Sequence, residues 1–423
     1  MKAASVFSQR HYYAGIVGNV LEHYDIALFG FLAPFLSPLF FSSYDHLTGL
    51  ILTYALLPLG ILARPLGALF FGWIGDAHGR KRALCFSLGF MALVTALMGL
   101  LPTFATVGYW APILLALLRA LQGFCIAGES SGGAIFILEE IRTLNKSLIS
   151  SLYSASSIAG ILLACGSVAW MAGCGRIEEG WRYLYFLGSL TALVGLVLRM
   201  GVVSCNRSLS CRTARNFRQI TQVLRLYFPV LCAIACTAGF SSTTYCQAMT
   251  LMHGYIPLIT SYSKADVMHW NTYLLLLDLC LLPCFGYLAA RFSKESLMRV
   301  AAFLSGLLAV PLFLMLPNAA FVTIIAVRVA LIVLGVAFAA PWHAWVQELV
   351  AREHRYTVIS LGTAIGSQLI GSPGPAVGLW IFQKTGWAFA PALYLVITAA
   401  LAFIAVNGVK LLSLRMGSVK GTS

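Results

Sequence analysis

Two acidic residues stand three positions apart in the first long apolar segment of the chain. Glu22 and Asp25 share one face of a helix because of this i, i+3 spacing. Two close carboxylates in a medium of low dielectric constant resist ionising together, so the pair can keep a proton. The spacing therefore indicates a site that binds and releases a proton. In the structural alternative, the pair neutralises Arg64 or Arg119 and holds helices together.

Further ionisable residues interrupt later apolar segments. Arg119 and Glu129 lie ten positions apart in one segment, which is about 15 Å along a helix axis, so they lie at different depths. A guanidinium fork suits a solute carboxylate, which makes Arg119 a candidate substrate-binding residue, with permanent pairing to an acidic residue as the alternative. Glu129 is a third candidate for proton coupling. Asp278 and Arg328 are expected to form a structural pair.

Polar and aromatic side chains in the same segments complete a candidate solute cavity. Aromatic faces stabilise quaternary ammonium groups, so Tyr24 and Trp342 suit a betaine-like solute. Each of these side chains taken singly is also an ordinary packing residue. The candidate substrate-binding residues are Arg119, Tyr24, Gln122, Tyr245, Trp342 and Gln368.

A run of glycines and prolines near the end of the chain predicts an irregular helix. The sequence Gly-Ser-Gln-Leu-Ile-Gly-Ser-Pro-Gly-Pro covers 366–375. Irregular backbone at membrane depth is tolerated where it lines a cavity. We therefore expect a gate or hinge in this segment.

A basic turn follows the second apolar segment, with the sequence Gly-Trp-Ile-Gly-Asp-Ala-His-Gly-Arg-Lys-Arg over 72–82. Its glycines allow close helix approach and a tight turn, and its aspartate is placed to cap the next helix or to pair with an arginine. We predict a cytoplasmic latch between helices that slide past each other, and the alternative is a simple basic turn. The predicted latch residues are Gly72, Asp76, Gly79, Arg80 and Lys81.

Composition places these residues in a membrane. The chain of 423 residues is 60% hydrophobic and 10% charged, with a mean hydropathy of +0.86, whereas an ordinary soluble domain is about a quarter charged. We therefore expect an all-α, multi-pass membrane protein. Segments of spanning length lie near 14–40, 47–74, 83–101, 110–138, 148–172, 181–203, 227–256, 267–290, 297–316, 319–347, 357–382 and 387–412.

The twelve segments divide into two six-helix pseudo-repeats. The expected halves are 1–203 and 227–423, joined by a basic cytoplasmic linker at 204–226. The halves resemble each other, because 286–296 is a degenerate copy of the basic turn, and Arg119 and Arg328 are each followed by a glutamate twenty positions later. Transporters are commonly built from such repeats, with the solute between them.

The net charge of +14 follows the same topology. Most of the 28 basic residues fall in segments on one side of the membrane, which by the positive-inside rule places both termini in the cytoplasm. The excess charge faces anionic lipid, so we expect no nucleic-acid partner. Most of the eleven cysteines lie inside apolar runs and are interpreted as packing residues, and no metal site is expected.

The basic turn, the Arg-Ala-Leu-Gln-Gly of 119–123 and the two halves of six helices resemble the major facilitator superfamily. Within it, Gly-Asn-Val-Leu-Glu-His-Tyr-Asp at 18–25, Arg-Pro-Leu-Gly at 64–67, Gly-Glu-Ser-Ser-Gly-Gly at 128–133 and Gly-Trp-Arg at 180–182 resemble the metabolite:proton symporter family. That family includes proline/betaine, α-ketoglutarate, citrate and shikimate carriers. The resemblance is strong over 15–200 and thinner afterwards, where the family's usual Phe-Pro-Thr stretch is absent.

Residues and resemblance together predict a secondary active transporter. We expect proton-coupled symport of a small zwitterionic or anionic organic metabolite, of betaine/proline or carboxylate type, by alternating access in a bacterial inner membrane. The expected partners are the solute, the proton and the lipid bilayer, with no cofactor and a functional monomer. The alternatives are an uncoupled facilitator, an organic-anion exchanger or a non-transporting sensor. An enzyme is not expected, because the sequence holds no HExxH, GxSxG or P-loop motif.

Overall fold

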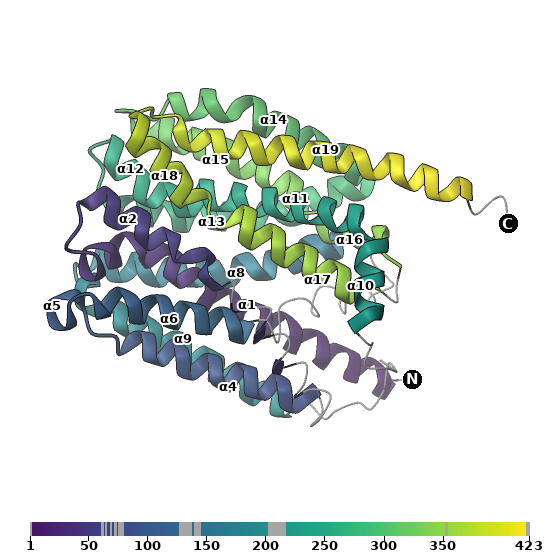
Figure 1. The fold of residues 1–423 in the computed structure, drawn as a ribbon, viewed down its shortest axis with the longest axis horizontal. Coiled ribbons are helices and arrows are strands. Elements are labelled where there is room, and N and C mark those ends of the chain that lie inside the picture. Colours follow the sequence, from purple (N-terminus) through teal and green to yellow (C-terminus); the bar gives the residue numbers. More distant parts are fainter. Residues whose placement is uncertain are drawn as a thin grey trace. The chain divides into compact units, whose positions relative to one another are not determined.

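The structure, a computed structural model, is helical throughout the part of the chain that it describes (Figure 1). The described residues are 2–60, 63, 66–67, 70–71, 74, 80–126, 138, 145–201, 217–351 and 354–419. No strand occurs among them. The all-α prediction is therefore confirmed.

The chain forms two compact units. Unit 1 comprises Met1–Gly133, Ser156–Ile220 and Lys264–Leu276, and unit 2 comprises Ala134–Ala155, Thr221–Ser263 and Leu277–Ser423. Two long helices, α8 (Lys146–Gly173) and α13 (Lys264–Arg291), each contribute residues to both units.

Unit 1 is built around the packing of α9 on α4 and α1, with α6 against α4. Close approach is possible where α8 meets α1, because a Cβ at Gly160 would lie 2.0 Å from the carbonyl oxygen of Val20. Its helices besides parts of α8 and α13 are α1 (Lys2–Phe40), α2 (His46–Ala55), the 3₁₀ turn η1 (Leu57–Leu59), α4 (Arg80–Gly99), α5 (Phe104–Val107), α6 (Trp110–Ile126) and α9 (Ile177–Gly201).

In unit 2, α11 packs against α17 and α19, and α14 packs against α15 and α19. Two π-helical turns, η2 and η3, interrupt its longer helical stretches. The elements are α10 (Phe217–Leu226, which begins in unit 1), α11 (Phe228–Tyr245), η2 (Cys246–Leu251), α12 (Met252–Ile259), α14 (Lys294–Leu314), α15 (Phe321–Ala339), α16 (Trp342–Leu349), α17 (Arg355–Ile365), η3 (Gly366–Gly371), α18 (Gly374–Thr385) and α19 (Ala390–Val419).

Each predicted span contains described helix. Six helical stretches are long and apolar enough to cross a membrane: Val17–Phe40, Lys146–Gly173, Lys264–Arg291, Lys294–Leu314, Phe321–Leu349 and Ala390–Val409. The predicted second, third and fourth spans contain the shorter apolar helices His46–Leu59, Cys85–Gly99 and Trp110–Cys125. The sixth is α9, and η2 and η3 divide the seventh and the eleventh.

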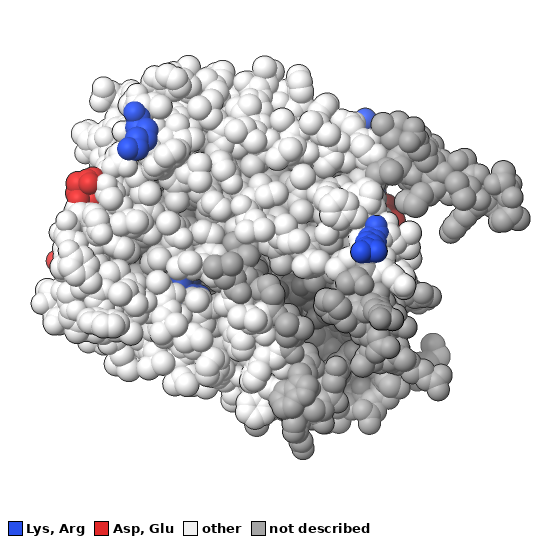
Figure 2. Space-filling model, viewed as in Figure 1, with Lys and Arg blue, Asp and Glu red and all other residues white. Residues whose placement is uncertain are grey.

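The helices carry large apolar side chains on their outer faces. Trp110, Trp170 and Val322 are each about two thirds or more exposed. Few charged side chains are visible among the described residues on the face shown in Figure 2, where most of the surface is white. Such an apolar surface suits lipid tails, and helices satisfy their backbone hydrogen bonds internally, as a spanning segment must.

A lysine compensates for a proline in α1. Pro38 has no N–H, so the carbonyl of Pro34, four residues earlier, lacks its helical donor. Lys264 Nζ, at the start of α13, donates to this oxygen over 3.0 Å. The bond attaches the beginning of α13 to α1 within unit 1.

Candidate functional site

Asp25 lies on α1 in the interior of unit 1 and is 2% exposed. Thr95 Oγ1, from α4, donates to Asp25 Oδ2 over 2.9 Å. Gln122 Nε2, from α6, donates to the same carboxylate oxygen over 3.3 Å and to Thr95 Oγ1 over 3.1 Å. Three helices therefore hold one carboxyl group through one of its two oxygens.

Arg119 is joined to this group through Gln122. Its Nη1 donates to Gln122 Oε1 over 2.7 Å, and its guanidinium carbon lies 4.2 Å from the centre of the Phe29 ring. The amide of Gln122 thus links the arginine to the carboxyl group of Asp25. Stacking on Phe29 fixes the plane of the guanidinium and provides a cation–π contact.

Four buried polar side-chain atoms of unit 1 have no hydrogen-bond partner among the described residues. They are Asp25 Oδ1, Arg119 Nε, Trp181 Nε1 and the hydroxyl of Tyr185. Tyr185 projects from α9 and is 1% exposed. Such atoms cost free energy unless another group satisfies them. Sequence reasoning missed Tyr185 and Thr95, because each is a single hydroxyl in an apolar segment.

Tyr24 and Asn19 attach the same helix to its neighbours. The Tyr24 hydroxyl lies 3.4 Å from both Ser167 Oγ and the carbonyl oxygen of Leu184, so both hydrogen bonds are long. Asn19 Nδ2 donates to Ser156 Oγ over 2.7 Å, and to the next serine over 2.9 Å. These bonds position α1, and therefore Asp25, against α8 and α9.

Two of the predicted substrate-binding residues in unit 2, Trp342 and Tyr245, lie on α16 and α11. Trp342 Nε1 donates to Thr237 Oγ1 over 3.1 Å, which fixes the indole at the start of α16. His343 makes edge-to-face contacts with Trp342 and with Tyr153, at centroid distances of 4.8 and 5.3 Å. Tyr245 is half-buried at the end of α11.

The two π-helical turns carry amide side chains. Gln368, in η3, accepts a hydrogen bond from Ser372 Oγ over 3.3 Å. Gln247, in η2, is fully buried, and neither of its amide atoms has a partner in the described part of the chain. The irregular helix expected at 366–375 is present as η3. No glycine or proline in the sequence marks η2, which was not expected.

The predicted pair of Asp278 and Arg328 is wrong. Arg328 Nε and Nη2 both donate to the carbonyl oxygen of Ala248, over 3.2 and 3.0 Å. Among the described residues, no ion pair joins this arginine to Asp278, which is buried on α13. The acceptor lies in η2, and a helix widened by a π-helical turn presents its carbonyl groups differently from an α-helix. The arginine therefore binds backbone.

Several predicted residues are not described. Arg64, Gly72, Asp76, Gly79 and Glu129 lie outside the described residues. Glu22, in α1, and Arg80 and Lys81, in α4, lie on described helix, but their side chains are not described. Their predicted roles therefore stay predictions.

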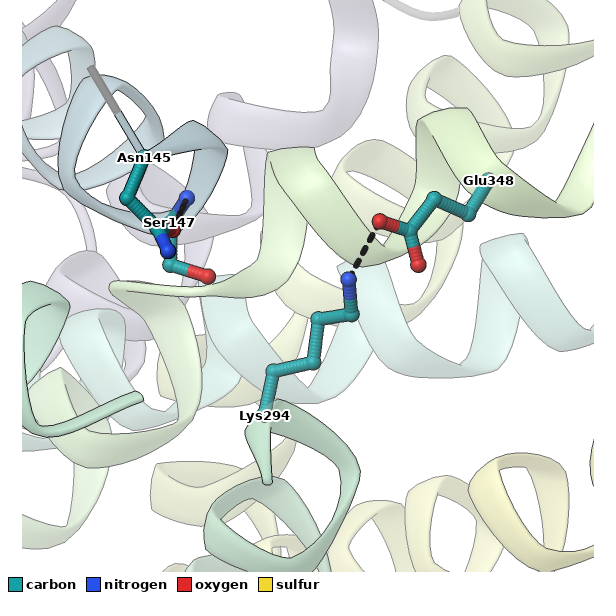
Figure 3. Close-up of polar contacts among 4 residues, drawn as sticks. All are labelled: Asn145, Ser147, Lys294 and Glu348. Carbon is teal, nitrogen blue, oxygen red and sulfur yellow. Dashed lines mark hydrogen bonds and ion pairs between the residues drawn. The ribbon is translucent and has the colours of Figure 1, made fainter. Parts of the chain in front are cut away.

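The degenerate second copy of the basic turn does make an ion pair. Lys294, at the start of α14, pairs with Glu348, near the end of α16 (Figure 3). Figure 3 also shows Asn145 at the start of α8, where its Oδ1 accepts from the backbone N–H of Ser147 over 2.9 Å. The start of α14 is thereby tied to α16, the helix that carries Glu348.

No metal-ion cluster occurs in the part of the chain that the structure describes, since no three His, Cys, Asp or Glu side chains group there. The chemistry available in unit 1 is instead a buried carboxyl group, a stacked guanidinium and a phenol. Such a set can hold a proton and bind a carboxylate.

The sequence of the chain is similar to those of known transporters. The family profile described as "Sugar (and other) transporter" matches residues 12–209. A proline/betaine transporter of Salmonella typhimurium is 27% identical over 410 residues, covering 92% of this chain and 81% of the relative. A glycine betaine/proline/ectoine/pipecolic acid transporter of Dickeya dadantii is 27% identical over 409 residues, with the same coverage.

Solved structures show the same fold at lower sequence identity. A D-xylose-proton symporter has a TM-score of 0.68 and 15% identity, over 95% of this chain and 96% of that protein. The xylose transporter of E. coli in an inward-open conformation has a TM-score of 0.67 and 16% identity, over 95% of each chain. The chain therefore has the fold of these proteins, which is the fold that its motifs predict.

Proposed function

We propose that this chain is a proton symporter of the major facilitator superfamily for zwitterionic or anionic metabolites, since its sequence is similar to transporters of small organic solutes and its fold is that of a proton symporter. The proline/betaine type of solute is favoured by the relatives from Salmonella typhimurium and Dickeya dadantii. The observation that carries the proposal is the buried carboxyl group of Asp25, linked through Gln122 to a buried arginine.

Asp25 is the proton carrier in this proposal. Its Oδ2 accepts from Thr95 and Gln122, while its Oδ1 has no described partner and is the oxygen that can take a proton. An ionisable side chain inside a membrane is costly, and its retention is explained by a role in proton translocation. Glu22 and Glu129 are proposed as further members of the proton path.

Arg119 is the proposed anchor for the solute carboxylate. Its Nη1 is engaged with Gln122, its face is stacked on Phe29, and its Nε edge keeps a free donor among the described residues. A charge-assisted hydrogen bond to a carboxylate is stronger than one between neutral groups. Tyr24 and Gln122 position the carboxyl group and the arginine of this site.

In unit 2 the proposed solute contacts are Tyr245, Trp342 and Gln368. The indole N–H of Trp342 is already engaged with Thr237, so its ring face is the part that remains for a quaternary ammonium group. The buried amide of Gln247 is a further hydrogen-bonding group in this unit.

The transport cycle proposed here is alternating access between the two halves, 1–203 and 227–423, joined by the linker 204–226. Both termini lie in the cytoplasm, the protein acts as a monomer in a bacterial inner membrane, and the turn with Gly72, Asp76, Gly79, Arg80 and Lys81 is a latch. The positive-inside pattern of the basic residues supports this orientation.

Uptake by proteoliposomes tests the proposal. With an inwardly directed proton gradient, we expect wild-type protein to accumulate L-proline or glycine betaine above equilibrium. Asp25→Asn should abolish accumulation and keep solute counterflow. Glu178→Gln, at an exposed carboxyl group on α9, is the matched control and should accumulate as wild type. If Asp25→Asn accumulates solute at the wild-type level, Asp25 is not the proton carrier. If wild-type uptake is the same with and without the proton gradient, the protein is a facilitator or an exchanger.

A further inference from the structure

Tyr185 carries a buried hydroxyl that has no partner among the described residues and that neither the sequence motifs nor the proposed cycle uses. It lies in α9, three residues before Gly188, and the two positions share a helix face. A Cβ at Gly188 would lie 3.2 Å from Asp25 Oδ1. The face of α9 that carries Tyr185 therefore faces the oxygen of Asp25 that has no described partner.

Tyr185, Arg119 and Asp25 interact electrostatically. Tyr185 lies within range of the charges of both Arg119 and Asp25, and Tyr24 is the other titratable group among the described residues there. The further described groups that face Asp25 are uncharged: Thr95 from α4, Gln122 from α6 and Gly188 from α9. A buried guanidinium donor and a buried phenol donor thus flank one carboxyl group.

We propose that Tyr185 O–H and Arg119 Nε–H donate to the carboxylate of the transported solute, and that Asp25 supplies a third donor when its Oδ1 carries a proton. The inference rests on the proposed symport function and deepens it, because it names the solute group that this site requires. The Tyr185 hydroxyl and Arg119 Nε–H are donors with no described partner, and Asp25 becomes a donor when it is protonated. One carboxylate can accept all three hydrogen bonds, because each of its two oxygens accepts more than one.

The arrangement explains how proton and solute are coupled. A protonated Asp25 donates its Oδ1–H to the solute carboxylate, so proton and solute are bound together. Loss of the proton converts the donor into an anion, and two carboxylates at hydrogen-bond distance in a buried site repel each other. The solute is then released with the proton. Gly188 leaves the space beside Oδ1 that the solute oxygen needs.

Solute binding at different pH values tests the inference, with L-proline as the probe and L-prolinamide, which has no carboxylate, as the comparison compound. Wild-type protein should bind L-proline more weakly as the pH rises, whereas Asp25→Asn, whose amide remains a neutral donor, should bind it with an affinity independent of pH. Tyr185→Phe should lose about tenfold in L-proline affinity at every pH, the loss of one hydrogen bond. The number of protons per solute should not change.

Matched variants of α9 separate this role from a structural one. Tyr183→Phe removes a hydroxyl from an exposed position of the same helix and should bind as wild type. Gly188→Ala places a methyl group beside Oδ1 and should weaken L-proline binding, whereas Gly195→Ala, whose Cβ would make an ordinary 3.7 Å contact, should not. The thermal midpoints of both tyrosine variants are measured as well, and equal midpoints show that a difference in L-proline affinity does not come from a difference in stability.

The outcomes distinguish this inference from the proposed function. If wild-type protein carries out symport and Tyr185→Phe binds L-proline with wild-type affinity, the proposed role of Tyr185 is wrong and the proposed symport function stands. Equal losses of L-proline and L-prolinamide affinity in Tyr185→Phe overturn the assignment to the carboxylate. A wild-type protein that neither binds nor transports L-proline, glycine betaine or citrate overturns both the inference and the proposed function.

Discussion

Gln122 donates to the carboxyl group of Asp25 with one end of its amide and accepts from Arg119 with the other, over 3.3 and 2.7 Å. A side-chain amide can do both at once, since it has a donor at one end and an acceptor at the other. The carboxyl group and the guanidinium are therefore held in fixed positions, while each keeps one atom that has no partner in the described part of the chain.

Replacing this amide should disconnect the two charged groups. Gln122→Leu keeps a side chain of similar size and removes both hydrogen bonds, so we expect kcat/KM for solute uptake to fall roughly tenfold or more. Uptake by proteoliposomes gives the measurement. Gln222→Leu, at an exposed position of α10, is the control. Wild-type kcat/KM in Gln122→Leu would show that the link has no part in transport.

Arg328 should contribute to the stability of unit 2 through the backbone of η2. Lysine lacks the planar fork with which Arg328 donates twice to the Ala248 carbonyl, so Arg328→Lys should lower the free energy of unfolding by about 1–3 kcal/mol. Thermal unfolding in detergent measures this loss. Arg176→Lys, at an exposed position, is the matched control. A midpoint equal to that of wild type would contradict a structural role for these bonds.

Helix α2 should respond to pH through its cap. The side chain and the backbone N–H of Thr48 both donate to the Asp45 carboxylate, the backbone N–H over 3.0 Å, and these hydrogen bonds lower the pKa of the Asp45 carboxyl below its usual value. A lowered pKa means that the ionised form stabilises the fold above the unfolded-state pKa of about 4, and that this contribution is lost as the pH falls through the folded-state value.

Two variants of Asp45 isolate that effect. Asp45→Asn keeps a capping acceptor without a charge, so its thermal midpoint should lie below that of wild type at neutral pH and approach it in acid. Asp45→Ala removes the cap and should be less stable than wild type at neutral pH. A difference between wild type and Asp45→Asn that does not change with pH would rule out the charge as its source.

The sequence predicted where the helices lie and which acidic residue is buried in the first of them, but it did not predict the hydrogen-bond partners of the site residues. Apolar segment lengths located the spans because a bilayer requires them, and an acidic residue in such a segment marked Asp25. The partners Thr95 and Tyr185 depend on how helices far apart in sequence are rotated against each other, which the composition of each helix does not specify. Arg328 was paired wrongly for the same reason, since its acceptor is a backbone carbonyl in an unexpected π-helical turn.

The hydrogen bond from Lys264 to the carbonyl of Pro34 should stabilise the protein only because Pro38 has no N–H to donate to that carbonyl. Lys264→Met removes the donor at nearly constant size, leaves the carbonyl without a partner and should cost about 1 kcal/mol of unfolding free energy. Pro38→Ala supplies the missing N–H, which can donate to the Pro34 carbonyl within α1. In that background Lys264 is no longer needed, so Lys264→Met should cost much less.

Unfolding of wild type, both single variants and the double variant forms a double-mutant cycle. We expect an interaction free energy of about 1 kcal/mol between positions 38 and 264, because both groups serve one acceptor. Lys384→Met, at an exposed position of α18, controls for the loss of a lysine and should cost the same with or without Pro38. Equal costs of Lys264→Met in the two backgrounds would mean that the proline does not create the need for the lysine, and that the attachment of α13 to α1 rests on other contacts.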